Sequence, residues 1–282
     1  MSSEPQRFGA RLLAAMEEHG PLCVGIDPHP ELLARWGLTD DADGVARFSD
    51  AVLAAVGGRV AAVKPQSAFF ERHGSAGMAV LERLLADLRE AGTLSVLDVK
   101  RGDIGSTMRA YAQAYLEDGA PLAADAVTIS PYLGTGSLAP AVDLARASSR
   151  GVFVLALTSN PEATPVQRVG DPSVARTVVE DVARLNAGSQ PVGDVGLVVG
   201  ATVGDAPADL GIDLAGAGAV LLAPGVGAQG AGPADLARTF AGAERRVLAS
   251  VSRGILSAGP IPEQVRSAAE SVTAQLVARL WS

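Results

Sequence analysis

Apolar runs of strand length alternate along the chain with longer amphipathic stretches. The runs are almost continuously hydrophobic, which is typical of parallel strands that are covered on both faces. Strands separated by helices predict a parallel sheet with crossover connections. There are eight such runs: Leu22–Asp27, Val60–Pro65, Leu94–Lys100, Ala124–Ser130, Gly151–Thr158, Val195–Ala201, Ala219–Pro224 and Arg246–Val251.

The stretches between these runs carry apolar residues at spacings of three and four, the period of a helix that buries one face. In Ser75–Ala91 the stripe includes Met78, Leu81, Leu85 and Leu88. Eight strand–helix units favour closure into a (β/α)8 TIM barrel, and a doubly wound open sheet of similar length is the alternative. Similar stripes mark three further segments: Ser106–Leu116, Ser173–Asn186 and Glu263–Leu280.

Length and composition agree with one barrel domain. The chain has 282 residues, of which 48% are hydrophobic and only 4% aromatic, so aliphatic side chains must build the core. No shift in composition divides it, and α/β barrels of this size commonly form one unit. We therefore expect residues 1–282 to form a single domain. Ser159–Pro172 is longer than most loops that follow a strand, and we expect it to be functional.

The charge balance argues against nucleic-acid and membrane partners. The net charge is −8, and no run of Lys and Arg supplies the basic face that nucleic acid requires. No segment is apolar over the roughly 18 residues that a membrane span needs. The single cysteine, Cys23, lies in an apolar run, which favours burial and a reducing compartment. Met1–Gly9 is polar and lacks the apolar centre of a signal peptide, so we expect a cytoplasmic protein.

Charged and polar residues gather where the predicted strands end, although the strands themselves are apolar. In a barrel of this kind, chemistry takes place at the carboxyl ends of the strands. Burying such groups is costly unless they pair with one another or bind a ligand. The set comprises Asp27, Lys64, Asp98, Lys100, Asp103, Thr128, Ser130, Ser159, Gln229 and Arg253.

The segment LDVKRGDI, at the end of the third predicted strand, is the sharpest signal. Because side chains alternate along a strand, Asp98 and Lys100 should both point toward the barrel axis, and Asp103 follows on the loop above. Lys64, from the second strand, could join them. An ammonium between carboxylates can stabilise developing charge and then donate a proton. A buried ion-pair network that only orders the barrel is the alternative.

The loops after the seventh and eighth strands predict a phosphate site, as in many barrels. The segment PGVGAQG lets backbone N–H groups approach a ligand, and its Gln229 adds a neutral donor. Arg253 offers a planar fork for phosphate oxygens. The same glycines match the dinucleotide pattern G-x-G-x-x-G, with Glu244 as the ribose-binding acid. However, Glu244 precedes the next strand, whereas that acid should end it.

The acidic and histidine residues do not predict a metal site. His19, His29 and His73 show no metal-ligand spacing. Lysines interleaved with the acidic residues argue against Mg²⁺. We therefore expect no metal.

Together, these motifs resemble those of the orotidine 5′-phosphate decarboxylase family, in its longer bacterial subfamily. The segment DVKRGD is similar to the family signature D-x-K-x-x-D, and the matches run in order from about residue 22 to residue 254. The resemblance implies decarboxylation of orotidine 5′-monophosphate (OMP) to UMP and CO₂ in pyrimidine biosynthesis, a carboxy-lyase reaction without cofactor or metal. Further similar segments are Val24–Pro28, Val63–Gln66, Ala223–Gln229 and the arginine after the last strand.

The resemblance also implies a role for each site residue. Lys100 would protonate C6 of the pyrimidine after CO₂ leaves, with Asp98 and Asp103 near the departing carboxylate. In this family two barrels pair, so Asp103, Ile104 and Thr107 would reach into the neighbouring site of a homodimer. The catalytic network would consist of Lys64, Asp98, Lys100 and Asp103.

The remaining site residues would bind the nucleotide. By the same resemblance, Asp27 would bind the ribose hydroxyls and Ser159 the pyrimidine edge. Pro224 would line the site, and Gln229 and Arg253 would hold the phosphate.

Two other functions stay open on the residues alone. An aldolase that works through a lysine Schiff base needs a lysine of lowered pKa, whereas Lys100 beside Asp98 and Asp103 should stay charged. A non-catalytic barrel that binds a phosphorylated metabolite would carry the costly charged array without benefit.

Overall fold

Eight parallel strands close into a barrel in which every strand pairs with its sequence neighbours and β8 pairs with β1. The structure is a computed structural model that describes residues 6–227 and 233–281. Closure confirms the (β/α)8 barrel expected from the sequence and rules out the open doubly wound sheet. The strands are β1 (Leu22–Ile26), β2 (Ala62–Pro65), β3 (Leu94–Arg101), β4 (Ala126–Ile129), β5 (Gly151–Leu157), β6 (Val195–Val199), β7 (Leu221–Pro224) and β8 (Val247–Val251).

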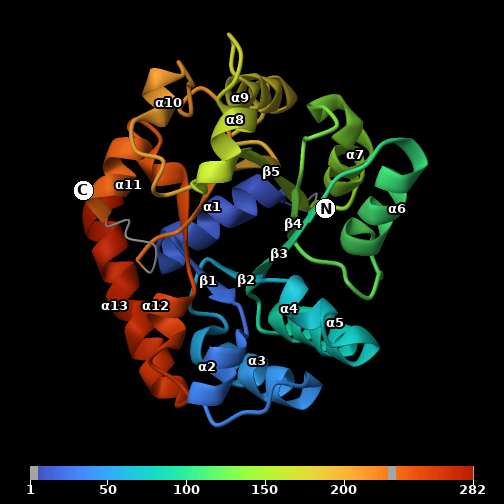
Figure 1. Cartoon of the computed structure of the whole chain (residues 1–282), viewed down its shortest axis with the longest axis vertical. Helices are drawn as coiled ribbons and strands as arrows, with labels where there is room; N and C mark the ends of the chain where they lie inside the picture. Colours follow the sequence, from blue (N-terminus) through green and yellow to red (C-terminus); the bar gives the residue numbers. More distant parts are fainter. Residues whose placement is uncertain (1–5, 228–232, 282) are drawn as a thin grey trace, which may run out of the picture.

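Helices surround the barrel, as Figure 1 shows, and the four helices predicted from apolar stripes correspond to α5, α6, α9 and α13. Ser173 caps α9, because its hydroxyl accepts a hydrogen bond from the N–H of Arg176 at 3.2 Å. The α-helices are α1 (Phe8–His19), α2 (Pro30–Arg35), α3 (Ala42–Val56), α4 (Ala68–Glu71), α5 (Gly74–Glu90), α6 (Gly105–Leu116), α7 (Ala139–Ala147), α8 (Thr164–Gln167), α9 (Val174–Leu185), α10 (Ala206–Asp209), α11 (Pro233–Thr239), α12 (Arg253–Leu256) and α13 (Pro262–Leu280). Short 3-10 helices are η1 (Thr135–Leu138), η2 (Pro161–Ala163) and η3 (Glu244–Arg246).

The long segment after β5 contains local structure of its own. It holds η2 and α8, and each of these begins with a proline in its first turn, where the missing N–H costs nothing. The side chain of Gln167 ties α8 back to the strand, because its Oε1 accepts from the N–H of Thr158 at 2.7 Å. The segment is thereby held next to the carboxyl end of the barrel.

The apolar side chains form two cores. The larger one fills the space between the strands and the outer helices. The smaller one, which we call the interior core, lies inside the barrel. Its members include Phe8, Leu12, Met16, Cys23, Ala62, Val96, Ala126, Phe153, Val198, Leu222 and Leu248.

Helix α1 covers the amino-terminal end of the barrel, across the middle of the view in Figure 1. Its Phe8 ring packs edge-on against Phe153, with ring centroids 6.1 Å apart. A Cβ at Gly151 would lie 2.0 Å from the Phe8 ring, so only glycine leaves room for this contact. This helix was not among those expected from the sequence.

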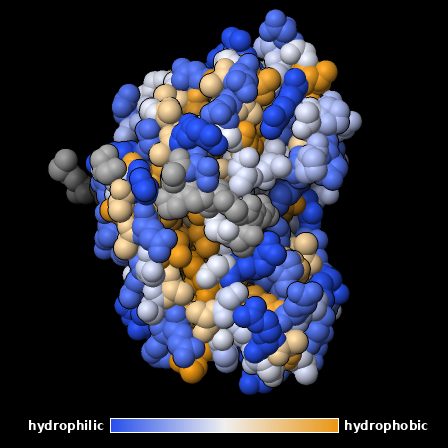
Figure 2. Space-filling model, turned by 60° about the vertical axis from the view of Figure 1, so that its left-hand side comes forward, coloured by the Kyte–Doolittle hydropathy of each residue, from blue (hydrophilic) through white to orange (hydrophobic). Residues whose placement is uncertain are grey.

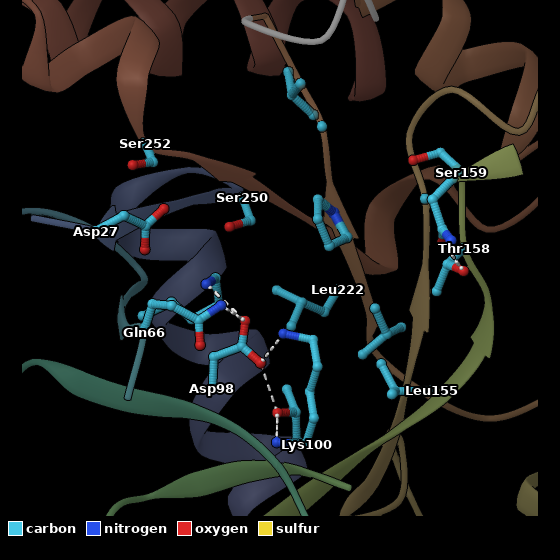
Figure 3. A pocket seen from close by; sticks show the side chains of 18 of the residues that line it. Asp27, Gln66, Asp98, Lys100, Leu155, Thr158, Ser159, Leu222, Ser250 and Ser252 are labelled. Carbon is cyan, nitrogen blue, oxygen red and sulfur yellow. Dashed lines mark hydrogen bonds and ion pairs between the residues drawn. The ribbon is translucent and has the colours of Figure 1, made fainter. Parts of the chain in front are cut away.

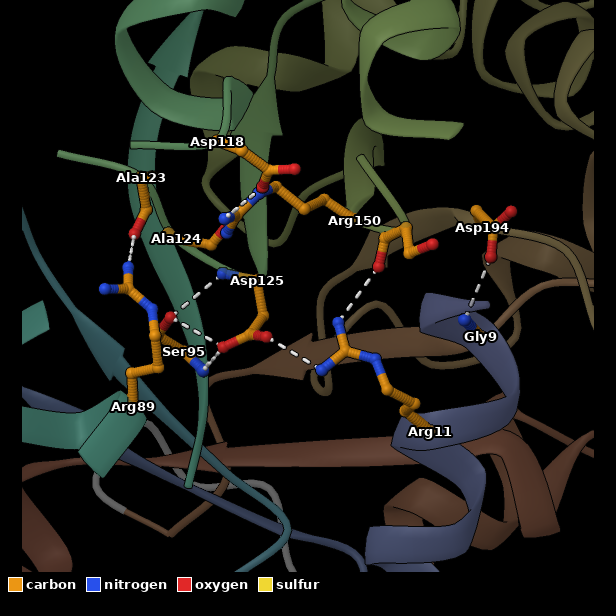
Figure 4. Close-up of polar contacts among 11 residues, drawn as sticks. Gly9, Arg11, Arg89, Ser95, Asp118, Ala123, Ala124, Asp125, Arg150 and Asp194 are labelled. Carbon is orange, nitrogen blue, oxygen red and sulfur yellow. Dashed lines mark hydrogen bonds and ion pairs between the residues drawn. The ribbon is translucent and has the colours of Figure 1, made fainter. Parts of the chain in front are cut away.

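Polar contacts fasten α1 to the starts of the strands (Figure 4). The N–H of Gly9 donates to Asp194 Oδ1 at 3.1 Å, and the guanidinium of Arg11 donates to Asp125 Oδ1 at 3.0 Å. Asp125 also accepts from the backbone and the hydroxyl of Ser95. These groups are therefore paired at the end of the barrel opposite to the candidate site.

Hydrophilic residues cover most of the face seen in Figure 2, and apolar residues show near its centre and in smaller groups toward its edges. No helix in the described part of the chain is both long and apolar enough to cross a membrane. Cys23 is buried in the interior core, as its apolar surroundings in the sequence predicted, and burial raises the pKa of its thiol to about 12.

Candidate active site

The candidate active site begins where the inward-facing positions of three neighbouring strands change from apolar to polar. On β2, β3 and β4, small or β-branched residues of the interior core point inward. Side chains on one face of a strand recur every second residue. Two residues further along each strand, the same face carries Lys64, Asp98 and Thr128, and all three side chains are buried.

These residues line a cavity of about 510 Å³ at the carboxyl end of the barrel. Figure 3 shows Gln66 and Lys100 reaching toward Asp98, while Thr158 and Ser159 stand on the opposite wall. The cavity therefore unites most of the residues predicted from strand ends. Those that line it are Asp27, Lys64, Asp98, Lys100, Thr128, Ser159, Pro224 and Arg253.

Asp98 is the centre of the polar contacts. Its Oδ1 accepts from Lys100 Nζ at 2.6 Å and from Thr128 Oγ1 at 2.8 Å. Its Oδ2 accepts from Lys64 Nζ at 3.0 Å and from Gln66 Nε2 at 3.1 Å. A carboxylate offers about four lone-pair positions. Asp98 therefore uses its whole acceptor capacity, which fixes its orientation.

The charges of this cluster stabilise one another. Burial would raise the pKa of Asp98, but Lys64 and Lys100 outweigh burial and hold that pKa well below its usual range. Burial would lower the pKa of Lys64, but Asp98 and then Asp27 outweigh it and hold the pKa above its usual value. Both groups thus remain charged at neutral pH. Two lysines against Asp98 leave one positive charge, which suits an anionic ligand.

Lys100 occupies an irregular part of β3. Leu97 pairs with Val127 and Arg101 pairs with Ile129, so three residues of β3 lie opposite the single residue Thr128. Within this bulge Lys100 has φ of 46°, a left-handed conformation that residues other than glycine rarely adopt. Its side chain is 48% exposed, so the ammonium stands at the cavity while its partner Asp98 is buried. The predicted shared direction of the two side chains is confirmed.

Asp103, Ile104 and Thr107 do not line the cavity of their own chain. Asp103 Oδ1 accepts from the N–H of Ile104 at 2.7 Å, and Thr107 is exposed on α6. Among the described residues, Asp98 is the only carboxylate that forms an ion pair with Lys100. The expectation that two carboxylates bracket this lysine is therefore not met within one chain, because the loop turns Asp103 away.

The predicted phosphate site is described in part. Arg253 begins α12 and lines the cavity, and its guanidinium has no hydrogen-bond or ion-pair partner among the described residues. Gln229 lies outside the described residues. Glu244 lies in η3, just before β8, so it is not placed where a ribose-binding acid would be.

Several residues at the cavity wall were given no role in the sequence analysis, and two of them bear on its chemistry. Gln66 lies two residues after Lys64 and forms an isolated bridge with Asp98. Because side chains on one face of a strand recur every second residue, this spacing could have identified Gln66 as a neighbour of Lys64 in the cavity. Ser252 was given no role either, and its buried Oγ has no hydrogen-bond partner among the described residues. The same is true of Asp27 Oδ1. Buried polar atoms without partners at a cavity wall point to a polar ligand.

The described residues contain no group of three or more His, Cys, Asp or Glu side chains that could hold a metal ion. The cavity instead combines ammonium, amide, hydroxyl and guanidinium donors with Asp27 and Asp98. Such a donor set is suited to a ligand that carries phosphate, carboxylate and hydroxyl groups.

Comparison with known proteins agrees with this geometry. A family model described as orotidine 5′-phosphate decarboxylase / HUMPS family matches residues 20–268. The orotidine 5′-phosphate decarboxylase of Salinispora arenicola is 59% identical over 278 residues, which cover 98% of this chain and 99% of the relative. The enzyme of the same name from Streptomyces coelicolor is 58% identical over 273 residues, with 95% and 96% covered.

Solved structures show the same fold. A crystal structure from Streptomyces avermitilis has a TM-score of 0.95 and 54% identity, and the match covers 99% of this chain and 98% of that one. Leishmania donovani OMP decarboxylase has a TM-score of 0.76 and 32% identity, with 98% and 100% covered. Because both the family model and these relatives span almost the whole chain, the protein belongs to the orotidine 5′-phosphate decarboxylase family.

Proposed function

We propose that this protein converts OMP to UMP and CO₂ by cofactor-free decarboxylation as part of pyrimidine biosynthesis. One observation carries the proposal: Lys64, Asp98 and Lys100 form a charged cluster, with Asp98 buried at its centre, in the same cavity as Arg253. The relatives that share at least 48% identity over nearly the whole chain bear the name of this activity. We propose that it acts in the cytoplasm on this small molecule, without a nucleic-acid or membrane partner.

Lys100 is the proposed proton donor. When the bond between C6 and the carboxylate breaks, CO₂ departs and the electron pair stays on C6. An ammonium that Asp98 holds at 2.6 Å can stabilise this charge and then transfer its proton to C6, and the resulting amine regains a proton from solvent. Lys64 and Gln66 support the cluster from the other oxygen of Asp98.

The rest of the cavity would bind the nucleotide. Arg253 and Gln229 would hold the phosphate, Asp27 the ribose hydroxyls and Ser159 the edge of the base, with Pro224 on the wall. Arg253 has no described partner, so its guanidinium is available for an anion. Binding energy from the phosphate can then help to organise the reacting end of the substrate.

The charged cluster also argues against a Schiff-base aldolase. Such an enzyme needs a neutral lysine amine as its nucleophile. The nearby carboxylates Asp98 and Asp27 hold the pKa of Lys64 above its usual value, although burial opposes them. Lys100 Nζ forms an ion pair with Asp98 Oδ1 at 2.6 Å, so this nitrogen is engaged with a carboxylate.

We further propose a homodimer in which each chain completes the other's site. Asp103 and Thr107 would reach the partner's cavity, together with Ile104. Large apolar side chains are exposed on the same rim: Ile104 is 62% exposed, Tyr132 82% and Leu133 53%. A second barrel would cover this patch and bring a further carboxylate toward Lys100.

Mixed dimers test the shared site. Lys100→Ala and Asp103→Asn chains, each inactive alone, should recover activity when unfolded together and refolded. Random pairing leaves one intact site in every mixed dimer, so about a quarter of wild-type activity is expected. No recovery, although mixed dimers are detected by mass spectrometry, would contradict the shared site.

The activity itself is tested by absorbance. Purified protein mixed with OMP should remove the orotate chromophore and release an equal amount of CO₂, with or without a chelator. Lys100→Ala should give no loss of absorbance while still binding UMP. An active Lys100→Ala variant would refute the proton-donor role, and an inactive wild-type protein would refute the decarboxylase assignment.

A further inference from the structure

The hydroxyl of Thr128 connects the bulge of β3 to the charged cluster. Thr128 Oγ1 accepts from the N–H groups of Val99 and Lys100 at 3.1 and 3.0 Å, and it donates to Asp98 Oδ1 at 2.8 Å. A threonine hydroxyl has one proton and two lone pairs. These three bonds therefore use its whole capacity. Because both lone pairs are occupied, its proton must point to Asp98.

The bulge explains why this hydroxyl is needed. Three residues of β3 lie opposite Thr128, so two N–H groups cannot take their normal partners on β4. Buried N–H groups without an acceptor are costly. Lys100 in addition adopts its unfavourable left-handed conformation, which persists only where the surroundings impose it. Thr128 is 1% exposed and supplies the acceptor at this point.

The residues that follow Lys100 are also fixed. The guanidinium of Arg101 donates to Glu71 Oε1 at 2.6 Å. A Cβ at Gly102 would lie 2.4 Å from the carbonyl oxygen of Ser130, so this position requires glycine. Neither contact engages the N–H of Lys100. Within the described chain, Thr128 alone joins the backbone of Lys100 to the carboxylate that its own ammonium contacts.

We propose that Thr128 is a positioning residue for decarboxylation: its hydroxyl holds the backbone of Lys100 in the left-handed conformation and directs Asp98, so that the ammonium is placed for proton transfer. This inference rests on the proposed role of Lys100. Thr128 touches neither the reacting carbon nor the phosphate in this scheme, so its loss should affect the chemical step more than binding.

Thr128→Val tests the inference, because valine has nearly the same shape but no hydroxyl. We expect kcat to fall about 100-fold, as for a displacement of a catalytic group by about 1 Å, while KM and the Kd for UMP change less than about threefold. Thr128→Ser keeps the hydroxyl and should restore kcat to within about fivefold of wild type. Thr128→Ala should behave like Thr128→Val, which provides a second variant if valine impairs folding.

Thr93→Val is the matched control. Thr93 lies at the opposite end of β3, is 3% exposed, and its Oγ1 accepts from the N–H of Gly58 at 2.7 Å. This variant also loses a buried hydroxyl that accepts a backbone N–H, but far from the cavity. It should lose stability with little change in kcat. An equal loss of kcat in this control would overturn the inference, as would a Thr128→Val enzyme with normal kcat or a Thr128→Ser enzyme without recovery.

Hydrogen exchange supplies a readout that does not depend on activity. The amide protons of Val99 and Lys100 should exchange faster in Thr128→Val than in wild type, and at unchanged rates in Thr93→Val. Unchanged protection of both amides in Thr128→Val would overturn the inference. If wild-type protein released no CO₂ from OMP, the proposed function would fail, and the two exchange rates would still decide whether Thr128 holds this backbone.

Discussion

Replacing Asp98 with asparagine would remove the central charge of the cluster and keep its shape. Asp98 accepts four hydrogen bonds in the structure. An asparagine side chain has one oxygen and an NH₂ group that only donates. At least two of the four donors would then face another donor. Lys64, which is 6% exposed, would lose its closest counter-charge in a place where little water reaches it.

The expected loss of stability in Asp98→Asn follows from the burial of Lys64. Breaking a buried ion pair by removing one partner typically costs about 3–5 kcal/mol. Asp27 remains as a second, more distant negative charge near Lys64. We therefore expect the free energy of unfolding to fall by roughly 3 kcal/mol, the lower end of that range. Turnover should be lost as well, because Lys100 would no longer be held.

The stability difference between Asp98→Asn and wild type should change with pH in a defined direction. In wild type the pKa of Lys64 is raised above its ordinary value, so this stabilisation is complete at neutral pH and is lost only as pH rises through the folded-state pKa. In Asp98→Asn, burial with a weaker counter-charge should lower the pKa of Lys64 instead. The variant should therefore gain stability relative to wild type as pH rises from about 7 to 10.

Urea denaturation at several pH values measures this difference. Asp125→Asn provides a control, because Asp125 also accepts several hydrogen bonds but lies at the other end of the barrel. That variant should be less stable without loss of turnover. An Asp98→Asn protein destabilised by less than about 1 kcal/mol, the effect of an ordinary substitution, would refute the argument that the buried pair is tightly coupled.

Three further outcomes are expected. Lys100→Ala should abolish OMP turnover while UMP still binds, as measured by calorimetry; measurable turnover would contradict the assigned role. Arg253→Ala should lower kcat/KM by about 100-fold or more, because a charge-assisted phosphate contact contributes to transition-state binding, and added guanidinium ion should restore part of it. Phe8→Ala should lower the free energy of unfolding by about 3–5 kcal/mol, because it leaves a cavity in the interior core next to Phe153, while kcat remains unchanged. A loss of kcat in the folded Phe8→Ala protein would contradict the separation of the two barrel ends.

The sequence predicted the barrel because its strands are long apolar runs and its helices carry clear stripes. Strand alternation also predicted correctly that Asp98 and Lys100 share a direction. The same rule could not predict the bulge at Lys100, because a bulge depends on the register between β3 and β4. For this reason Thr128 was recognised as a residue at a strand end but given no role.

Helix α1 was not predicted, although Phe8, Leu12 and Met16 recur at the spacing of a helix that buries one face. Its position across the barrel end could not be predicted, because that depends on contacts with strands far away in the sequence, such as Gly9 with Asp194 and Arg11 with Asp125. Periodicity along the chain contains no information about such partners. Within the described residues only Asp98 forms an ion pair with Lys100, and the contribution that we propose for Asp103 would require a second molecule.

The helix that covers the amino-terminal end has a consequence for how small molecules move. Below Lys64 and Asp98 the barrel is filled by the interior core, and Phe8, Leu12 and Met16 of α1 complete this filling. Among the described residues, the filled interior leaves the carboxyl end as the way by which substrate enters the barrel and CO₂ escapes from it. With the nucleotide bound in this cavity as we propose, CO₂ would leave past the product, and that step would belong to the catalytic cycle.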